Sequence, residues 1–168
     1  YHGGTHLPDI AVVTPVFAGG GAEILFFVAA RGHHADIGGI APGSMSPMAT
    51  RIEEEGVYID PFKLVEGGRF REDAVLQLLT QGPYPARDPA QNIADLKAQA
   101  AANAKGVDEL GKMVAQYGLG VVQAYMGHVQ DNAAASVARV IEELEPANFA
   151  VETDTGARIK VAIDIDRA

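Results

Sequence analysis

No cysteine and no tryptophan occur among the 168 residues of the chain. Without cysteine, a disulfide scaffold and a thiolate metal site are both excluded. Long hydrophobic runs are also lacking, because the longest one, residues 24–30, is far shorter than the roughly 20 residues that a membrane-spanning helix needs. Basic residues are few, with 13 Lys and Arg against 22 Asp and Glu and a formal net charge of −9. Because such a chain repels phosphate groups, we expect no nucleic-acid and no membrane partner. We also expect a soluble protein, since no apolar run is long enough to span a membrane, and we expect it to be cytoplasmic.

The chain does contain enough apolar sequence for one hydrophobic core. Hydrophobic residues make up 48% of it and charged residues 21%, a balance that excludes a disordered protein. A single domain is expected at this length. The first residue is Tyr1 rather than methionine, and polar motifs begin almost immediately after it. We therefore expect residues 1–168 to be a single domain or a fragment of a larger domain.

The spacing of apolar residues changes along the chain from a strand pattern to a helical one, which predicts an α+β fold. Three adjacent glycines, residues 19–21, separate two β-branched and aromatic runs, which is typical of a β-hairpin. The two long helices are expected to form an antiparallel helical hairpin interrupted by Gly118 and Gly120. The predicted strands are 9–17, 24–30, 57–59, 62–65, 149–152 and 158–163, the last two forming a C-terminal hairpin, and the predicted helices are 71–81, 88–117 and 121–144.

Four of the five histidines lie in the first 34 residues, in two clusters that each contain a carboxylate. Residues 5–9 form the first cluster and residues 31–39 the second. Antiparallel pairing of the first hairpin returns the second cluster to the same end as the first. Imidazole and carboxylate groups together suit Mn, Fe, Zn or Ni where no thiolate is present. The alternative is that these are ordinary polar residues at loop ends, bonded to backbone groups.

Three further motifs have an ordinary explanation beside a functional one. Ser44 lies in the turn-rich stretch 41–47 and could offer a hydroxyl to a substrate, although turn chemistry explains it equally well. Asn92, Asp95 and Gln99 are three and four residues apart on a predicted helix, where a solvated face is the favoured interpretation. His128, in the middle of a helix, is expected either to be a buried, hydrogen-bonded residue or to line a pocket.

Six motifs follow one another along the chain: GGTHLPD at 3–9, VVTPVF at 12–17, HHADIGG at 33–39, PGSM at 42–45, R-x-P-x-x-N-x-x-D-L-x-A-Q at 87–99 and YM-x-H-x-QDNA at 125–133. Together they resemble the hydantoinase B/oxoprolinase family. The resemblance runs in register over about residues 1–145, and the longer glycine turn at 19–21 is its main departure. Family proteins are much longer, so the chain is similar to an internal piece of one.

The resemblance implies an ATP-dependent opening of a cyclic amide such as 5-oxoproline or N-methylhydantoin. ATP would be bound by a separate hydantoinase A-type ATPase subunit or domain, and the full complex would be an oligomer. An acetone carboxylase-like, Mn-dependent subunit is the alternative within the family. The contrasting interpretation is a non-catalytic module that docks the ATPase partner. No nucleotide-binding loop is present, so we expect the chain alone to be inactive.

The resemblance also implies roles for individual residues. A divalent metal, Mn, Zn or Fe, would be held by His6, Asp9 and His33, with His34 as the rival third ligand. Asp36 would orient an imidazole. Altogether the expected catalytic residues are His34, Asp36 and Ser44, and the expected substrate-binding residues are Asn92, Asp95 and His128.

Overall fold

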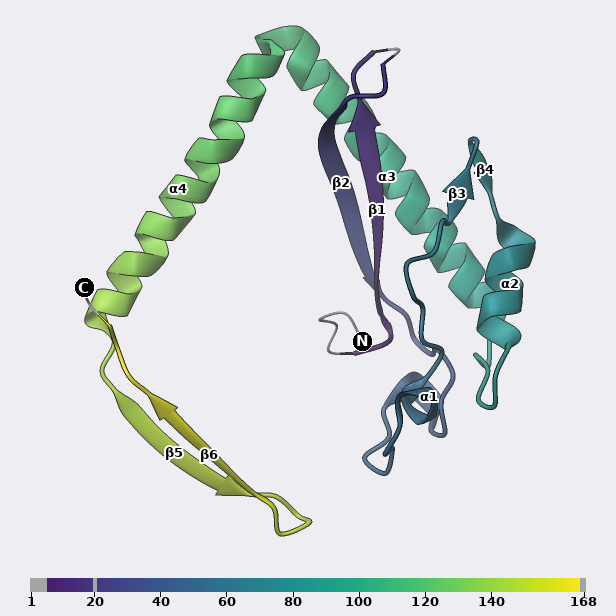
Figure 1. The fold of residues 1–168 in the computed structure, drawn as a ribbon, viewed down its shortest axis with the longest axis vertical. Helices are drawn as coiled ribbons and strands as arrows, with labels where there is room; N and C mark the ends of the chain where they lie inside the picture. The colour runs from purple at the N-terminus through teal and green to yellow at the C-terminus, as the bar shows by residue number, and fades with distance from the viewer. Residues whose placement is uncertain (1–5, 20, 167–168) are drawn as a thin grey trace. The chain divides into compact units, whose positions relative to one another are not determined.

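A computed structural model describes residues 6–19 and 21–166 of the chain (Figure 1). They form two compact units, Tyr1–Gly111 and Lys112–Ala168. Antiparallel hairpins lie at both ends of the sequence and long helices between them, which confirms the predicted α+β class. No helix in the described part is long and apolar enough to cross a lipid bilayer. The elements are β1 (Asp9–Phe17), β2 (Ile24–His33), η1 (Pro42–Ser44), α1 (Ile52–Glu55), β3 (Val65–Glu66), β4 (Arg69–Phe70), α2 (Glu72–Thr80), α3 (Pro89–Tyr117), α4 (Leu119–Glu143), β5 (Ala147–Glu152) and β6 (Arg158–Ile163).

The first hairpin forms as predicted. β1 pairs antiparallel with β2, from Asp9 opposite His33 to Phe17 opposite Ile24. An irregularity between Val16 and Phe17 follows the proline of β1 directly. β2 continues three residues beyond its predicted end, because the predicted strand stops at residue 30 and the observed one at His33. The pairing therefore brings both ends of the hairpin, with their polar clusters, to one place.

The strands predicted over 57–59 and 62–65 are wrong in most of their length. Within the described residues, 57–64 form no strand, and only the two-residue strands β3 and β4 surround the turn at Gly67-Gly68. The apolar side chains of Val57, Ile59, Phe62 and Leu64 pack against the core instead. Pro61, between them, has no N–H to donate to a ladder. Packing rather than strand pairing therefore explains this apolar pattern.

α3 begins where the Asp88-Pro89 pair predicts. The carboxylate of Asp88 accepts a hydrogen bond from Gln91 N at 3.1 Å, and its carbonyl accepts one from Asn92 N at 3.2 Å. Pro89 takes the first helical position, where no N–H is needed. α2, α3 and the loop before α3 share one hydrophobic core, which consists of Ile37, Val75, Leu79, Ala86, Ile93 and Leu96.

Buried amide side chains of α3 contact the first hairpin, which corrects the favoured prediction of a solvated face. Asn92 and Gln99 are only 2% and 8% exposed, and Asn103 is 1% exposed. Gln99 Nε2 donates to Ile10 O at 2.8 Å, and Asn103 Nδ2 donates to Val12 O at 2.9 Å. The strand carbonyls thus replace water as hydrogen-bond partners, which offsets the desolvation cost of burying these amides.

Glycine allows α3 and the hairpin to approach closely, and this gives a test by mutation. A Cβ added at Gly106 would lie 2.8 Å from Val28 Cγ1, whereas one at Gly111 would have no described atom within 4 Å. We expect Gly106→Ala to lower the free energy of unfolding by about 1–3 kcal/mol through overpacking. Gly111→Ala should raise it by about 0.5–1 kcal/mol, because alanine is the better helix former. Urea denaturation of both variants checks this, and equal effects at the two positions would contradict the packing described.

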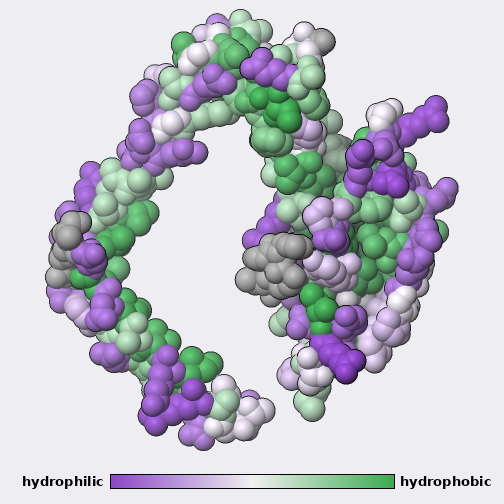
Figure 2. All heavy atoms as spheres, viewed as in Figure 1, coloured by the Kyte–Doolittle hydropathy of each residue, from purple (hydrophilic) through white to green (hydrophobic). Residues whose placement is uncertain are grey.

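The second unit contains α4 and the C-terminal hairpin. Gly118, with φ of 84°, separates α4 from α3 as predicted, whereas Gly120, the other predicted interruption, lies within α4. β5 pairs antiparallel with β6 around the predicted turn, which confirms the last hairpin. Hydrophobic side chains are exposed on this unit (Figure 2). Val129 and Phe149 are 66% and 68% exposed. The antiparallel pairing of the two long helices stays a prediction.

Candidate active site

The open end of the first hairpin brings two histidines and a carboxylate together. Asp9 and His33 are cross-strand partners, and the ring centroids of His6 and His33 are 5.3 Å apart. A Cβ added at Gly32 would lie 3.0 Å from Gln99 Cδ, so this face of β2 packs against α3. Because side chains alternate along a strand, His33 lies on the opposite face. His33 is exposed and His6 is half-buried. Both imidazoles are therefore accessible to a ligand from the solvent side.

An arginine binds the carboxylate of this cluster. Arg31 Nη2 lies 2.5 Å from Asp9 Oδ2. The hydrogen bond from Arg31 holds the pKa of Asp9 below its ordinary value, and the nearby imidazoles of His33 and His6 act in the same direction. Asp9 is consequently a carboxylate at neutral pH, paired with a guanidinium.

This pairing bears on whether the cluster fits a metal ion. Two imidazoles and one carboxylate have suitable donor chemistry. In the part of the chain that the structure describes, however, no three His, Cys, Asp or Glu side chains are arranged to hold a metal ion. The donor set is thus assembled at one end of the hairpin, but its carboxylate is engaged by Arg31.

A groove runs beside the same cluster, between β1, residues 58–65 and α3. Its volume is about 930 Å³, and His6 and Asp9 line it where β1 begins. The rest of the lining is mostly apolar, with Ile10, Phe62 and Leu96 among its side chains. An apolar groove with a few convergent polar groups is the usual form of a small-molecule site.

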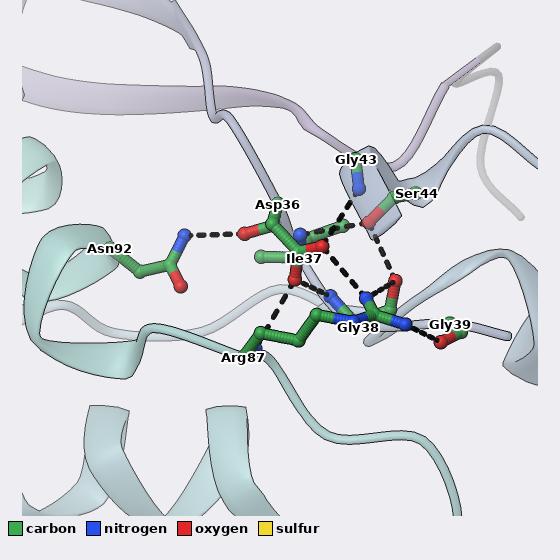
Figure 3. A network of polar contacts seen from close by, with 8 residues as sticks. All are labelled: Asp36, Ile37, Gly38, Gly39, Gly43, Ser44, Arg87 and Asn92. Carbon is green, nitrogen blue, oxygen red and sulfur yellow. Dashed lines mark hydrogen bonds and ion pairs between the residues drawn. The ribbon is translucent and has the colours of Figure 1, made fainter. Parts of the chain in front are cut away.

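The loop after β2 is organised by the carboxylate of Asp36 (Figure 3). Its Oδ1 accepts from Gly38 N at 2.9 Å and from Arg87 N at 3.2 Å. Its Oδ2 accepts from Gly43 N at 2.9 Å and from Arg87 Nη1 at 2.7 Å. Burial by itself would raise the pKa of Asp36, but these backbone and guanidinium donors outweigh it and hold the pKa below its ordinary value. Asp36 therefore ties the loop to Arg87, two residues before the start of α3.

Ser44 is enclosed by the same loop. Its side chain is 4% exposed, its Oγ accepts from Ile37 N at 2.8 Å, and it donates to Gly38 O at 2.7 Å. Gly38 and Gly39 have φ of 91° and 87°, and a Cβ at Gly39 would lie 2.6 Å from Glu55 O. These bonds give Ser44 a structural place in the loop, while its predicted catalytic role stays a prediction.

His34 is buried against α3. It is 1% exposed, and both ring nitrogens meet amide side chains: Nδ1 lies 3.0 Å from Asn92 Nδ2, and Nε2 lies 3.2 Å from Gln99 Oε1. The carboxylate of Asp95, which is partly exposed, approaches His34 Nδ1 to 4.0 Å. His34 thus has the surroundings of a fixed internal residue, in contrast to the accessible His33.

The other predicted substrate-binding residue lies in the second unit. His128 is exposed on α4, and its ring meets that of Tyr125 edge-on at 5.7 Å between centroids. The described structure therefore brings Asn92 and Asp95 to the side of His34, while His128 belongs to the other unit.

Comparison with known proteins identifies the family of the chain. The profile described as Hydantoinase B/oxoprolinase matches residues 1–168. The chain belongs to the hydantoinase B/oxoprolinase family. It is 45% identical to the 5-oxoprolinase of Dictyostelium discoideum over 174 residues, which are 98% of this chain and 13% of that protein. It is 36% identical to the caprolactamase subunit beta of Pseudomonas jessenii over 130 residues, 77% of this chain and 21% of that protein.

A solved structure shares the fold of this hydantoinase B/oxoprolinase family member. The crystal structure of the ATP-dependent caprolactamase from Pseudomonas jessenii matches with a TM-score of 0.74 and 29% identity. The match covers 97% of this chain and 29% of that one. The chain therefore corresponds to a minor part of the longer relatives.

Sequence reasoning assigned no role to two residues that organise the site of this family member. Arg87 donates to Asp36 and also, through Nη2, to Gly39 O at 2.7 Å. Gln99 joins His34 to both strands of the hairpin. The available signal for Gln99 was its distance of seven residues from Asn92, which places both on one face of α3.

Proposed function

We propose that the chain is the lactam-opening part of an ATP-dependent cyclic amide hydrolase. The observation that supports this most is the meeting of His6, Asp9 and His33 at the hairpin end, beside an apolar groove. The relatives named 5-oxoprolinase and caprolactamase act on cyclic amides, five- and seven-membered respectively, and the chain shares their family. A hydantoinase A-type ATPase subunit or domain is the proposed partner, and it binds and consumes ATP.

The chemistry assigned to the hairpin end is general acid–base catalysis. The ATPase partner transfers a phosphoryl group from ATP to the lactam carbonyl oxygen. Water then attacks the activated carbonyl carbon, and an accessible imidazole, His6 or His33, takes the proton that the water loses. The C–N bond breaks as the imidazole returns the proton to the leaving nitrogen, which forms an amino group and an acyl phosphate. A second water hydrolyses the acyl phosphate to the carboxylic acid and inorganic phosphate. Such proton transfer contributes about 10²- to 10⁴-fold to the rate of an enzyme. The ion pair with Arg31 keeps Asp9 ionised beside the two imidazole rings.

The mostly apolar lining of the groove suits the methylene groups of a lactam ring. Ile10 and Leu96 line it beside β1 and α3. In this arrangement the ring methylenes lie against the apolar lining and the amide lies at the hairpin end, beside His6 and Asp9. Asp95 remains a proposed substrate-binding residue, and Asp36 and Ser44 act by shaping the loop next to the histidines. The role predicted for His128, which belongs to the second unit, stays a prediction.

The experiment that tests this function combines the chain with the ATPase partner. Ring opening of 5-oxoproline, N-methylhydantoin and caprolactam is followed by chromatography with ATP, without ATP and without the partner. We expect product from at least one lactam only when the chain, the partner and ATP are all present. Turnover by the chain alone, or no turnover of any lactam by the complete mixture, would contradict the proposal.

A divalent metal at the hairpin end is proposed on its donor set alone. His6, Asp9 and His33 would hold it, and when bound it would supply Lewis-acid polarisation of a carbonyl or water. Asp9 would first have to leave Arg31, with which it is paired. No catalytic step above depends on the metal.

Competition between Arg31 and a metal for Asp9 leads to a prediction. We expect His6→Ala to abolish binding of Mn²⁺ or Zn²⁺ measured by calorimetry, because a ligand is lost. Arg31→Ala should strengthen binding by a few-fold, since removal of this exposed ion pair frees the carboxylate of Asp9 for the metal. His128→Ala, in the other unit, is the matched control and should leave binding unchanged. Equal binding by wild type and His6→Ala would rule out this site.

A further inference from the structure

The orientation of the Asn92 side chain determines whether His34 Nδ1 carries a proton. Asn92 Nδ2 lies 2.9 Å from Asp36 O and 3.0 Å from His34 Nδ1. A carbonyl oxygen can only accept, so the amide nitrogen, not its oxygen, must face Asp36. Both amide hydrogens are then directed at Asp36 O and His34 Nδ1. Consequently His34 Nδ1 accepts a hydrogen bond and carries no proton.

Gln99 determines the protonation of the other ring nitrogen, Nε2, in the same way. Its Nε2 donates to Ile10 O at 2.8 Å and to Ala30 O at 3.1 Å, which uses both of its hydrogens. Its Oε1, an acceptor only, is left facing His34 Nε2 at 3.2 Å. The proton of the ring must therefore be on Nε2. The two amides independently require the same neutral tautomer.

The backbone of His34 connects this arrangement to the reactive end of the hairpin. His34 N donates to Pro8 O at 2.8 Å, and Ile10 N donates to the same carbonyl at 3.0 Å. Pro8 is almost fully buried and stands between His6 and Asp9 in the sequence. His34 thus joins the segment that carries His6 and Asp9 to the strand end that carries His33.

We propose that Asn92 and Gln99 are positioning residues, which hold His34 as the Nε2–H tautomer and through it fix His6, Asp9 and His33 relative to one another. Neither amide touches the substrate in this proposal. Asp95 is the charged group that faces the ring, but its 4.0 Å separation from Nδ1 is too long for a hydrogen bond. The catalytic consequence rests on the proposed function, whereas the tautomer does not.

The tautomer can be read by NMR on the chain labelled with ¹⁵N. Long-range ¹H–¹⁵N spectra distinguish a protonated from a bare ring nitrogen, and His34→Gln identifies the His34 signals by their loss. At neutral pH we expect His34 to have a bare Nδ1 and a protonated Nε2. A protonated Nδ1, or signals averaged between the two tautomers, would overturn the proposal. The tautomer itself is read on the wild-type chain, whose histidine signals can also be assigned sequentially if His34→Gln does not fold.

Asn92→Asp then tests the role of the amide directly. The variant replaces the donor facing Nδ1 with an acceptor, so a proton should appear on His34 Nδ1. Gln116→Glu makes the same change from amide to carboxylate at an exposed position of α3 and should leave the His34 signals unchanged. A folded Asn92→Asp chain with the wild-type His34 signals would contradict the proposal.

Activity in the complex separates this inference from the proposed function. We expect Asn92→Asp to lower kcat about 10- to 100-fold with little change in KM, as is usual for the outer partners of active-site histidines. Unchanged kcat in a lactam-opening complex would refute the positioning role. If the wild-type complex opens no lactam while His34 has the expected tautomer, the proposed function fails and the assignment of the tautomer remains.

Discussion

Replacement of His33 by alanine is expected to slow lactam opening by the complex at least about 100-fold, the usual contribution of a general acid–base group. His33 is exposed at the hairpin end, opposite Asp9 and 5.3 Å from the His6 ring. Alanine removes the imidazole but leaves the strand pairing, which depends on backbone groups. We therefore expect the loss in kcat/KM without a matching loss of stability.

The control for His33→Ala is a variant far from the reactive groups. Asp73→Asn changes an exposed residue in the first turn of α2 and should retain wild-type kcat/KM. Initial rates with saturating ATP and partner, together with urea midpoints, measure both quantities. A His33→Ala complex with more than a tenth of wild-type activity would remove His33 from the proposed catalytic set.

Asp36→Ala should give the largest loss of stability. The variant leaves the N–H groups of Gly38 and Gly43 and the guanidinium of Arg87 without their acceptor. Because hydrogen bonds to a charged group are worth about 1.5–3 kcal/mol and unpaired donors add a desolvation cost, we expect the free energy of unfolding to fall by about 2–4 kcal/mol. Denaturation of the exposed-site variant Asp73→Ala should show a change below about 0.5 kcal/mol. A loss as small as that for Asp36→Ala would show that the loop does not depend on this carboxylate.

The pH dependence of the Asp36 contribution has a defined sign. The pKa of Asp36 in the folded chain is below its ordinary value of 3.8. Its ionised form therefore stabilises the folded state at all pH values above about 3.8, and this stabilisation is lost as the pH falls through the lower folded pKa. The difference in unfolding free energy between wild type and Asp36→Ala should be constant near neutrality and should shrink in acid. A difference that grows in acid would contradict the assigned direction.

Local chemistry was sufficient to predict the elements that depend on neighbouring residues. The glycine turn between two β-branched runs predicted β1 and β2, and Asp88-Pro89 predicted the first residue of α3. The segment 57–65 could not be predicted in this way, because its alternating apolar pattern is compatible with a strand or with an extended stretch packed on a core. Pro61 was the available sign against a strand.

The buried polar residues of the site depend on partners that are distant in the sequence. Gln99 bonds to Ile10 O, 89 residues away, so its position on a helix gave no indication of burial. The two histidine clusters were predicted to meet because the hairpin alone determines that contact. The ion pair of Arg31 with Asp9 depends on the rotamers of two side chains and was not predicted.

The most direct test of the account is a structure of the chain bound to its ATPase partner and to a lactam analogue that resists opening. The account predicts that the lactam ring occupies the groove beside β1, with its amide carbonyl at the hairpin end against His6 and Asp9 and its methylenes toward Leu96. A lactam bound with none of His6, Asp9 and His33 within contact distance would contradict the assignment of the hairpin end as the reactive site.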